Sequence, residues 1–185
     1  MARPSSLPPS GAQPLHVVVM GVAGCGKSAV GTRLAEALRL TLIEGDDFHP
    51  SANIAKMRQG IPLQDADRAD WLRRLGDELQ ARPGGAVLTC SALKRAYRDR
   101  LRAAVPALRF LHLALTPQQA LARVAARTDH FYPPSLVASQ FEALEDPAAE
   151  AGVLVIDATR PLAAIVDQAL ADLAAHPDLQ AFNNP

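Results

Sequence analysis

Five short stretches of the chain consist almost entirely of apolar residues, and longer stretches of mixed polarity separate them. Strands that are buried on both faces of a parallel sheet give continuous apolar runs of this kind, whereas half-exposed strands alternate between apolar and polar residues. The pattern therefore predicts five buried strands, at Leu15–Met20, Leu40–Ile43, Ala86–Cys90, Leu108–Leu115 and Val153–Ile156.

The stretches between these runs have the periodicity of helices. Val30, Leu34 and Leu38, for example, recur every four residues and would form one face of a helix. Alternating strands and helices indicate an α/β fold of three layers, in which helices flank a five-stranded parallel sheet. The predicted helices are Ala29–Leu38, Ala66–Leu79, Lys94–Ala104, Pro117–Arg127, Pro134–Leu144 and Pro161–Ala174.

The length of 185 residues suits one domain with a full hydrophobic core. Residues 1–14 are rich in Pro, Ser, Gly and Ala and have no periodicity, so we expect a disordered tail there. We expect a second loose tail at residues 177–185. The folded domain would then span residues 15–176.

Charge and cysteine content narrow the range of functions. The chain has 19 basic and 19 acidic residues, which argues against nucleic-acid binding because no basic excess is available to displace counterions. No apolar run approaches the roughly 20 residues of a membrane span, and the N-terminus lacks the apolar core of a secretory signal. The 2 cysteines cannot form a dense disulfide framework, so we expect a reducing compartment, the cytoplasm.

A glycine-rich sequence, G-V-A-G-C-G-K-S, follows the first predicted strand at residues 21–28. It matches G-x-x-x-x-G-K-[ST] between a strand and a helix, the pattern of phosphate-binding loops (P-loops). Glycines let main-chain N–H groups face a phosphate, Lys27 reaches its terminal oxygens and Ser28 can ligate Mg²⁺. A chance glycine-rich turn is the alternative. The residues expected to contact the nucleotide here are Gly21, Val22, Ala23, Gly24, Cys25, Gly26, Lys27, Ser28 and Ala29.

Carboxylates follow the second predicted strand, in the sequence E-G-D-D-F-H-P at residues 44–50. The carboxyl ends of parallel strands border the ligand crevice of such a fold. These carboxylates could therefore orient Mg²⁺ or accept a proton from an attacking hydroxyl group. A solvated acidic turn is the alternative interpretation.

Cationic residues gather after other predicted strands. Lys94 follows the third strand, and clustering of this kind favours binding of an anion, although each cation alone could be an ordinary surface residue. His16 and His112 lie inside apolar runs, and we assign them no function. The stretch 123–140 is typical of a lid and contains Arg123, Arg127, His130 and Tyr132.

The chain resembles the bacterial-type gluconokinases, which are P-loop kinases of the adenylate and shikimate kinase-like group. The resemblance runs from residue 21 to about residue 147 and rests on strings that are more specific than the P-loop. The matching strings are GVAGCGKS, EGDDFHP, NIAKMRQGIPLQDADRADWL, TCSALKRAYRDRLR and HFYPPSLVASQFEALEDP.

This resemblance implies ATP-dependent phosphorylation of the 6-hydroxyl of D-gluconate, with Mg²⁺, by a five-stranded parallel sheet that carries a mobile lid. It gives catalytic roles to Lys27, Asp46 and Arg127, with the Asp46 carboxylate facing the acceptor hydroxyl. Arg123 would join Arg127 as a lid cation over the ATP phosphates. Substrate contacts would come from Asp46, His49, Lys56, Arg68, Ser91, Lys94, Arg98 and His130.

Three residues depart from the family pattern. Glu44 stands where many relatives have Asp, Tyr132 where they have Met, and Cys25 where they have Ser. None of these changes removes a required group, so Ser28 and Glu44 remain the residues expected at the Mg²⁺ ion.

Two other functions stay open at this point. A kinase for shikimate or a nucleoside monophosphate would share the sequence features up to residue 28, and a nucleotide-sensing module would use the same loop without an acceptor. The guanine motif N-K-x-D of GTPases is absent. We expect the adenine near residues 157–160, and a homodimer is one assembly that the sequence leaves open.

Overall fold

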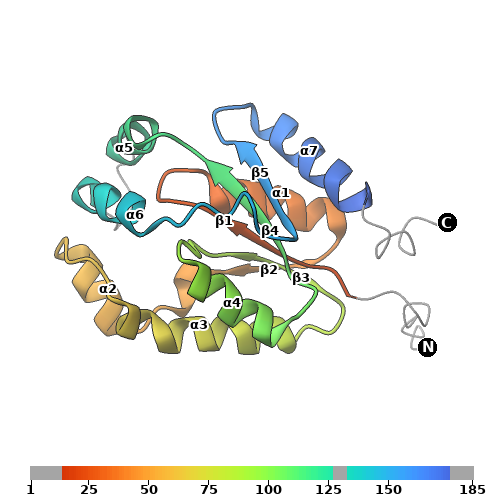
Figure 1. Cartoon of the computed structure of the whole chain (residues 1–185), viewed down its shortest axis with the longest axis horizontal. Coiled ribbons are helices and arrows are strands. Elements are labelled where there is room, and N and C mark those ends of the chain that lie inside the picture. The colour runs from red at the N-terminus through yellow and green to blue at the C-terminus, as the bar shows by residue number, and fades with distance from the viewer. Residues whose placement is uncertain (1–13, 127–132, 176–185) are drawn as a thin grey trace, which may run out of the picture.

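The computed structural model describes residues 14–126 and 133–175, and the two expected tails, Pro14 excepted, lie outside that range. A five-stranded sheet in the order β2-β3-β1-β4-β5 forms the centre of the molecule, and every pair of neighbouring strands is parallel, as predicted (Figure 1). The strands are β1 (His16–Met20), β2 (Thr41–Glu44), β3 (Ala86–Thr89), β4 (Arg109–Ala114) and β5 (Val153–Asp157).

Helices connect the strands within the described ranges. Each predicted helix has a counterpart, although α1 begins two residues earlier than expected, at Lys27, and α6 begins only at Val137. The α-helices are α1 (Lys27–Leu38), α2 (Ser51–Arg58), α3 (Asp65–Gln80), α4 (Arg95–Ala104), α5 (Pro117–Ala125), α6 (Val137–Ala143) and α7 (Leu162–Ala175), and the 3₁₀ helices are η1 (Gly45–Phe48) and η2 (Pro134–Leu136).

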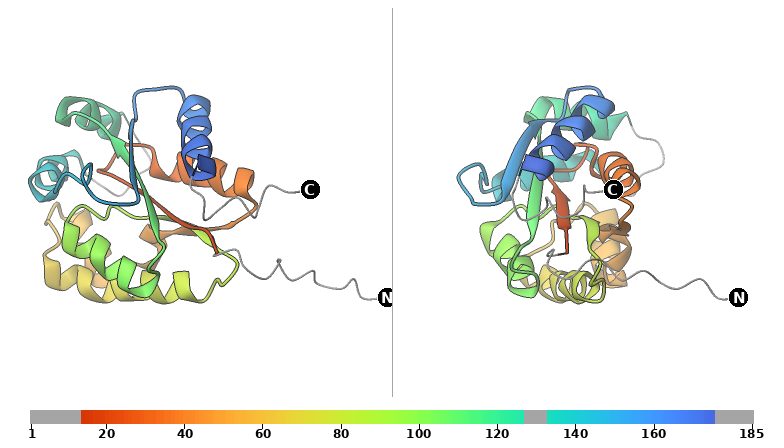
Figure 2. Two further views of the ribbon diagram at one scale, coloured as in Figure 1. Left: turned by 45° about the vertical axis from the view of Figure 1, so that its right-hand side comes forward. Right: turned by 90° about the vertical axis from the view of Figure 1, so that its right-hand side faces the viewer.

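Two hydrophobic cores lie on opposite faces of the sheet and give the three predicted layers. Side chains of successive strand residues point to opposite faces, so Val17 and Val19 join the core under α1 and α7, whereas Val18 and Met20 join the core under α3 and α4. Figure 2 shows these two helix layers on either side of the sheet. The central strand β1 is buried along its whole length, which places the segment after it at the middle of the sheet edge.

The segment after β2 was not predicted to be helical. It forms η1 and then α2, in which only Asn53 and Met57 are buried. Because α2 presents no continuous apolar stripe, the periodicity that reveals the other helices is absent from its sequence. These two elements nevertheless place the residues after Glu44 beside the carboxyl end of the sheet.

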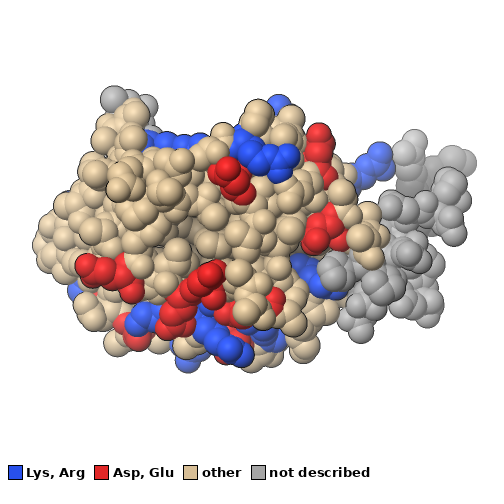
Figure 3. Space-filling model, turned by 45° about the horizontal axis from the view of Figure 1, so that its top comes forward, with Lys and Arg blue, Asp and Glu red and all other residues tan. Residues whose placement is uncertain are grey.

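Charged side chains of both signs mingle on the surface. Figure 3 shows Lys and Arg side by side with Asp and Glu along the lower part of the face in view. On α3, Arg73 pairs with Asp70 and Asp77, and Arg74 pairs with Asp70, all between exposed groups. Such pairs contribute little to stability.

In the described part of the chain, no helix is both long and apolar enough to span a membrane.

Arg98 of α4 was expected to contact substrate, and the structure assigns it a different role. Its side chain is fully buried, and its N–H groups donate to the carbonyl oxygens of Ala92, Leu93 and Glu145 and to the Glu150 carboxylate. Arg98 lowers the pKa of Glu150, chiefly through this hydrogen bond. A guanidinium with all these partners inside the protein ties α4 to the segment before β5 and has no N–H left to aim at a substrate.

We expect Arg98→Ala to lower the free energy of unfolding by about 3 kcal/mol, because it leaves the buried Glu150 carboxylate without its main partner. Urea denaturation measures this change. The control is Arg95→Ala on the same helix, where the side chain is 69% exposed and pairs with Asp99 at 3.6 Å. The control should cost less than about 1 kcal/mol, and equal costs for the two variants would contradict the structural role of Arg98.

Candidate active site

The predicted P-loop lies between β1 and α1, at the middle of the carboxyl edge of the sheet. Its backbone needs glycine at two positions in particular. Gly21 has φ +142°, and an added Cβ would lie 2.8 Å from both Cys25 Sγ and Leu113 O. Gly26 has φ +97° and is the residue that precedes the first turn of α1. These two glycines therefore let the loop turn back on itself and lead directly into α1.

The main-chain N–H groups of the loop fall into two sets. Those of Gly21, Ala23 and Cys25 donate to Ser91 O, Gln140 Oε1 and Val22 O, respectively. Within residues 14–126 and 133–175, no acceptor is present for the N–H groups of a second set, which surrounds the N-terminus of α1. This second set is Gly24, Gly26, Lys27, Ser28 and Ala29, and Val22 N, earlier in the loop, has no acceptor in those ranges either.

The second set makes the N-terminus of α1 a site for an anion. The first N–H groups of a helix have no partner within it, and the helix dipole places positive charge there. No acidic residue lies in the first turn of α1. The Ala23 N–H is already used, because it donates to Gln140 Oε1 at 2.6 Å, and the contact of Ala23 with the nucleotide stays a prediction.

The Lys27 ammonium lies along the loop, where Nζ donates to Gly21 O and Val22 O, each at 3.1 Å. It lines a cavity together with Ser28. A compact charge held at the loop by two carbonyl groups can exchange them for phosphate oxygens with little movement.

Ser28 and Glu44 come together as expected for a metal site. Ser28 Oγ donates to Glu44 Oε2 at 3.1 Å, and Thr89 Oγ1 donates to the same oxygen at 2.7 Å. These are hard oxygen ligands, which suit Mg²⁺, and Mg²⁺ usually takes one or two protein ligands and completes its shell with phosphate and water. The residues present therefore fit the ion.

The cavity continues from the P-loop to the elements after β2 and β3. Besides Lys27 and Ser28, it is lined by four residues from the expected substrate set, namely Asp46, His49, Arg68 and Ser91. Sequence reasoning missed other residues that line it, including Met57, Leu63, Trp71, Leu136 and Gln140. A cavity with a phosphate cradle at one end and Asp46 and Arg68 at the other can bring a phosphate donor and an anionic acceptor together.

Lys56 and Lys94 do not line this cavity. Lys56 Nζ pairs with Asp67 Oδ1 at 2.6 Å, and Lys94 Nζ contacts both oxygens of Asp65 at 2.7 and 2.9 Å. The pKa values of both carboxyl groups are lowered, chiefly by hydrogen bonds from these lysines. The two aspartates of the D-x-D-R motif thus hold the lysines, and Arg68 is the cation of the motif that reaches the cavity.

His49 stacks on Trp71, with ring centroids 4.2 Å apart and planes 13° apart. Asn53 Nδ2 donates to Asp67 O at 2.9 Å and lies 3.5 Å from His49 Nδ1. An amide N–H can only donate, so Nδ1 accepts and the neutral ring carries its proton on Nε2. Nε2 lies 4.0 Å from Asp46 Oδ1. Burial lowers the pKa of His49 to about 4, against the opposing effect of Asp46.

This pKa predicts how stability depends on pH. In the unfolded chain His49 takes up a proton near its ordinary pKa of 6.5, whereas in the folded protein it does so only near 4. Between these pH values, protons therefore bind preferentially to the unfolded chain. The free energy of unfolding consequently decreases as the pH falls from 6.5 to 4. NMR titration should give a midpoint near 4, and His49→Gln should reduce the acid loss of stability. A midpoint near 6.5 would contradict this.

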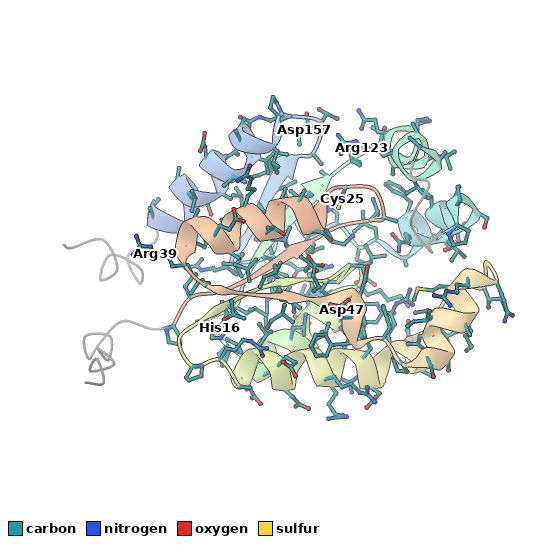
Figure 4. The ribbon with its side chains drawn as sticks, turned by 180° about the vertical axis from the view of Figure 1, so that it is seen from behind. His16, Cys25, Arg39, Asp47, Arg123 and Asp157 are labelled. Carbon is teal, nitrogen blue, oxygen red and sulfur yellow. The ribbon has the colours of Figure 1, made fainter. Side chains whose placement is uncertain are left out.

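The lid residues are described only in part. Arg127, His130 and Tyr132 lie outside the described residues. Arg123 of α5 donates from Nη2 to Ala158 O at 2.8 Å and from Nη1 to Gly24 O at 3.4 Å, so it links the P-loop to the turn after β5. Figure 4 shows it on the same side of the molecule as Asp157. Arg123 does not line the cavity and instead contacts the main chain of the P-loop.

Comparison with known proteins identifies the family of this chain. Residues 17–151 match the family model described as an AAA domain. The thermosensitive gluconokinase of Escherichia coli (strain K12) is 44% identical over 155 residues, which cover 82% of this chain and 83% of the relative. The gluconokinase of Gluconobacter oxydans (strain 621H) is 46% identical over 147 residues, covering 78% of this chain and 83% of the relative. This chain belongs to the gluconokinase family.

A solved structure supports the same assignment. The crystal structure of a gluconokinase from Sinorhizobium meliloti 1021 has 48% sequence identity and a TM-score of 0.81, and it covers 88% of this chain and 93% of that one. As a member of the gluconokinase family, this protein is a P-loop kinase that uses a nucleotide and a small-molecule substrate.

Proposed function

We propose that the protein transfers the γ-phosphoryl group of ATP to the 6-hydroxyl of D-gluconate and releases 6-phospho-D-gluconate and ADP. The observation that carries this proposal is that one cavity is lined both by Lys27 and Ser28 of the P-loop and by Asp46 and Arg68. The names of its gluconokinase relatives give the acceptor. A cavity of this composition suits a phosphate donor at one end and a polyol carboxylate at the other.

On the donor side, the unpaired N–H groups around the N-terminus of α1 would bind the β- and γ-phosphates of ATP. Lys27 would leave the carbonyl groups of Gly21 and Val22 and place its ammonium on the γ-phosphate, where charge develops during transfer. Ser28 and Glu44 would hold Mg²⁺, which neutralises phosphate charge when it is bound. Arg127 would complete the neutralisation if the lid closes, and this role remains a prediction.

On the acceptor side, Arg68 would pair with the carboxylate of D-gluconate, and Ser91 would contact its hydroxyl groups. Asp46 would orient the 6-hydroxyl for in-line attack and accept its proton. The neutral His49 offers its Nε2–H beside Asp46, so it can donate a hydrogen bond to a sugar hydroxyl without adding charge. His130 remains a predicted contact from the lid.

A substrate panel tests this function. We expect ATP-dependent turnover with D-gluconate to exceed that with its epimers, and we expect none above background with shikimate or nucleoside monophosphates. A coupled ADP assay measures the rates, and ³¹P NMR identifies the ester at the 6-position. Preference for shikimate or a nucleotide would replace this proposal with another kinase, and nucleotide binding without any acceptor-stimulated turnover would favour a nucleotide-sensing module.

Two further expectations belong to the same proposal. An enzyme that consumes ATP and supplies a phosphorylated sugar acid to metabolism would work in the cytoplasm. A homodimer would be detected as twice the chain mass of 19.7 kDa in sedimentation equilibrium.

A further inference from the structure

One string that supports the family assignment, S-Q-F-E-A-L-E at residues 139–145, has no role in the reaction as described so far. It forms most of α6 and the turn that follows it. Its glutamine, Gln140, lines the cavity alongside Lys27 and Ser28. The string therefore lies against the P-loop, although more than a hundred residues separate them in the sequence.

Gln140 makes the only side-chain hydrogen bond to an N–H of the loop among residues 14–126 and 133–175. Its Oε1 accepts from Ala23 N at 2.6 Å, across 117 positions of the sequence. The partner is a main-chain donor, so the contacting atom must be the amide oxygen, and Nε2 is left at the other end of the side chain. The contact is short and partly buried, which makes it a firm attachment of α6 to the loop.

This bond is one of three that occupy N–H groups of the loop, since Gly21 N donates to Ser91 O and Cys25 N donates to Val22 O, each at 3.3 Å. Within the described ranges, no acceptor is present for the N–H of Gly24, the residue that follows Ala23, and its φ is +82°. By fixing the peptide plane at Ala23, the Gln140 oxygen sets the direction in which the following glycine turns the chain.

The far end of the string is fixed as firmly. Glu145 Oε2 accepts from Arg95 N at 2.6 Å, at the start of α4, and Glu145 N donates to Leu93 O at 3.0 Å. The same turn after β3 carries Ser91, which lines the cavity. The string is therefore attached to the P-loop at Gln140 and to the acceptor-side turn at Glu145.

We propose that Gln140 is a positioning residue of the P-loop: its side-chain oxygen holds the Ala23 peptide so that the N–H groups of Gly24 and of Gly26 to Ala29 face the phosphates. Glu145 anchors the helix that carries it. The proposal rests on the proposed function only in that a nucleotide phosphate occupies the loop, and it does not depend on the identity of the acceptor.

Gln140→Leu tests this proposal, because leucine has a similar size but no acceptor. Without the oxygen, the Ala23 N–H loses its partner and the loop is free to take other conformations. We expect affinity for ADP with Mg²⁺, measured by calorimetry, to fall about tenfold and KM for ATP to rise by a similar factor, with KM for D-gluconate unchanged. The Ala23 N–H should exchange with solvent faster, as measured by ¹⁵N NMR.

Two further variants separate positioning from general destabilisation. Glu142→Leu places the same new side chain on the exposed face of α6 and should leave ADP affinity and Ala23 exchange unchanged. Gln140→Glu retains an oxygen acceptor and should keep the slow exchange of the Ala23 N–H. If Gln140→Leu does not fold, slow exchange of Ala23 in both the wild type and Gln140→Glu supports the contact, and fast exchange in the wild type overturns it.

The outcomes distinguish this proposal from the proposed function. Equal ADP affinity and equal Ala23 exchange in Gln140→Leu and Glu142→Leu would overturn the positioning role, even if the wild type phosphorylates D-gluconate. A tenfold loss of ADP affinity confined to Gln140→Leu would support that role, even if the wild type prefers another acceptor.

Discussion

Asp46→Asn is expected to lower kcat for D-gluconate phosphorylation by roughly a thousandfold while ATP affinity stays within about twofold of wild type. The asparagine amide has nearly the same shape as the carboxylate and still lines the cavity, but it cannot accept the proton of the 6-hydroxyl. Asp46 follows β2 on η1 and lines the cavity from outside the P-loop, so the substitution leaves Lys27 and the N–H groups of the loop in place. Steady-state kinetics and calorimetry with an ATP analogue measure the two quantities.

The neighbouring carboxylate provides a matched control. Asp47 lies on the same 3₁₀ helix and is exposed, but it does not line the cavity. Asp47→Asn should therefore keep kcat within about twofold of wild type. A collapse of ATP affinity in Asp46→Asn would instead place Asp46 at the metal ion, and near-normal kcat would remove it from the reaction.

Lys27→Ala is expected to lower kcat by about a hundredfold or more, the scale of losing a strong donor to a charge that develops in the transition state. The substitution removes the ammonium and leaves the main-chain N–H at the start of α1 in place. ATP should still bind through the remaining N–H groups, with lower affinity. Single-turnover measurements at saturating ATP separate the loss in transfer from the loss in binding.

The control for this change lies two turns further along α1. Arg33 is exposed, pairs with Glu36 at 3.5 Å and does not line the cavity, so Arg33→Ala should leave kcat unchanged. Lys27→Arg should restore little activity, because a planar guanidinium does not reproduce a compact ammonium in a tight loop. Wild-type turnover in Lys27→Ala would remove the P-loop from the transfer step.

Local patterns in the sequence were sufficient to predict the sheet and the P-loop. Continuous apolar runs predicted all five strands, because helices cover both faces of the sheet and its central strands β3, β1 and β4 need no polar alternation. The edge strands β2 and β5 are less buried and carry exposed residues such as Thr41 and Val155. The P-loop could be predicted because its residues are consecutive and its strand and helix flank it directly. The helix α2 could not be predicted, because only two of its side chains are buried and its sequence gives no periodic pattern.

The site predictions that differ from the structure involve residues whose partners are distant in the sequence. Lys94 reaches Asp65 across 29 positions, and Arg98 reaches Glu150 across 52, so both cations are held by carboxylates that periodicity cannot assign to them. Gln140 bonds to Ala23 across 117 positions and was missed for the same reason. Only the fold brings these pairs together, and so it divides the candidate polar residues into those that line the cavity and those with structural partners.

A crystal structure with a non-hydrolysable ATP analogue, Mg²⁺ and D-gluconate tests the central claim most directly. The account predicts the β- and γ-phosphates against the N–H groups of Gly24 and of Gly26 to Ala29, with the 6-hydroxyl of D-gluconate within hydrogen-bond distance of the Asp46 carboxylate. Phosphates bound away from the N-terminus of α1, or a D-gluconate whose 6-hydroxyl lies out of reach of Asp46, would contradict it.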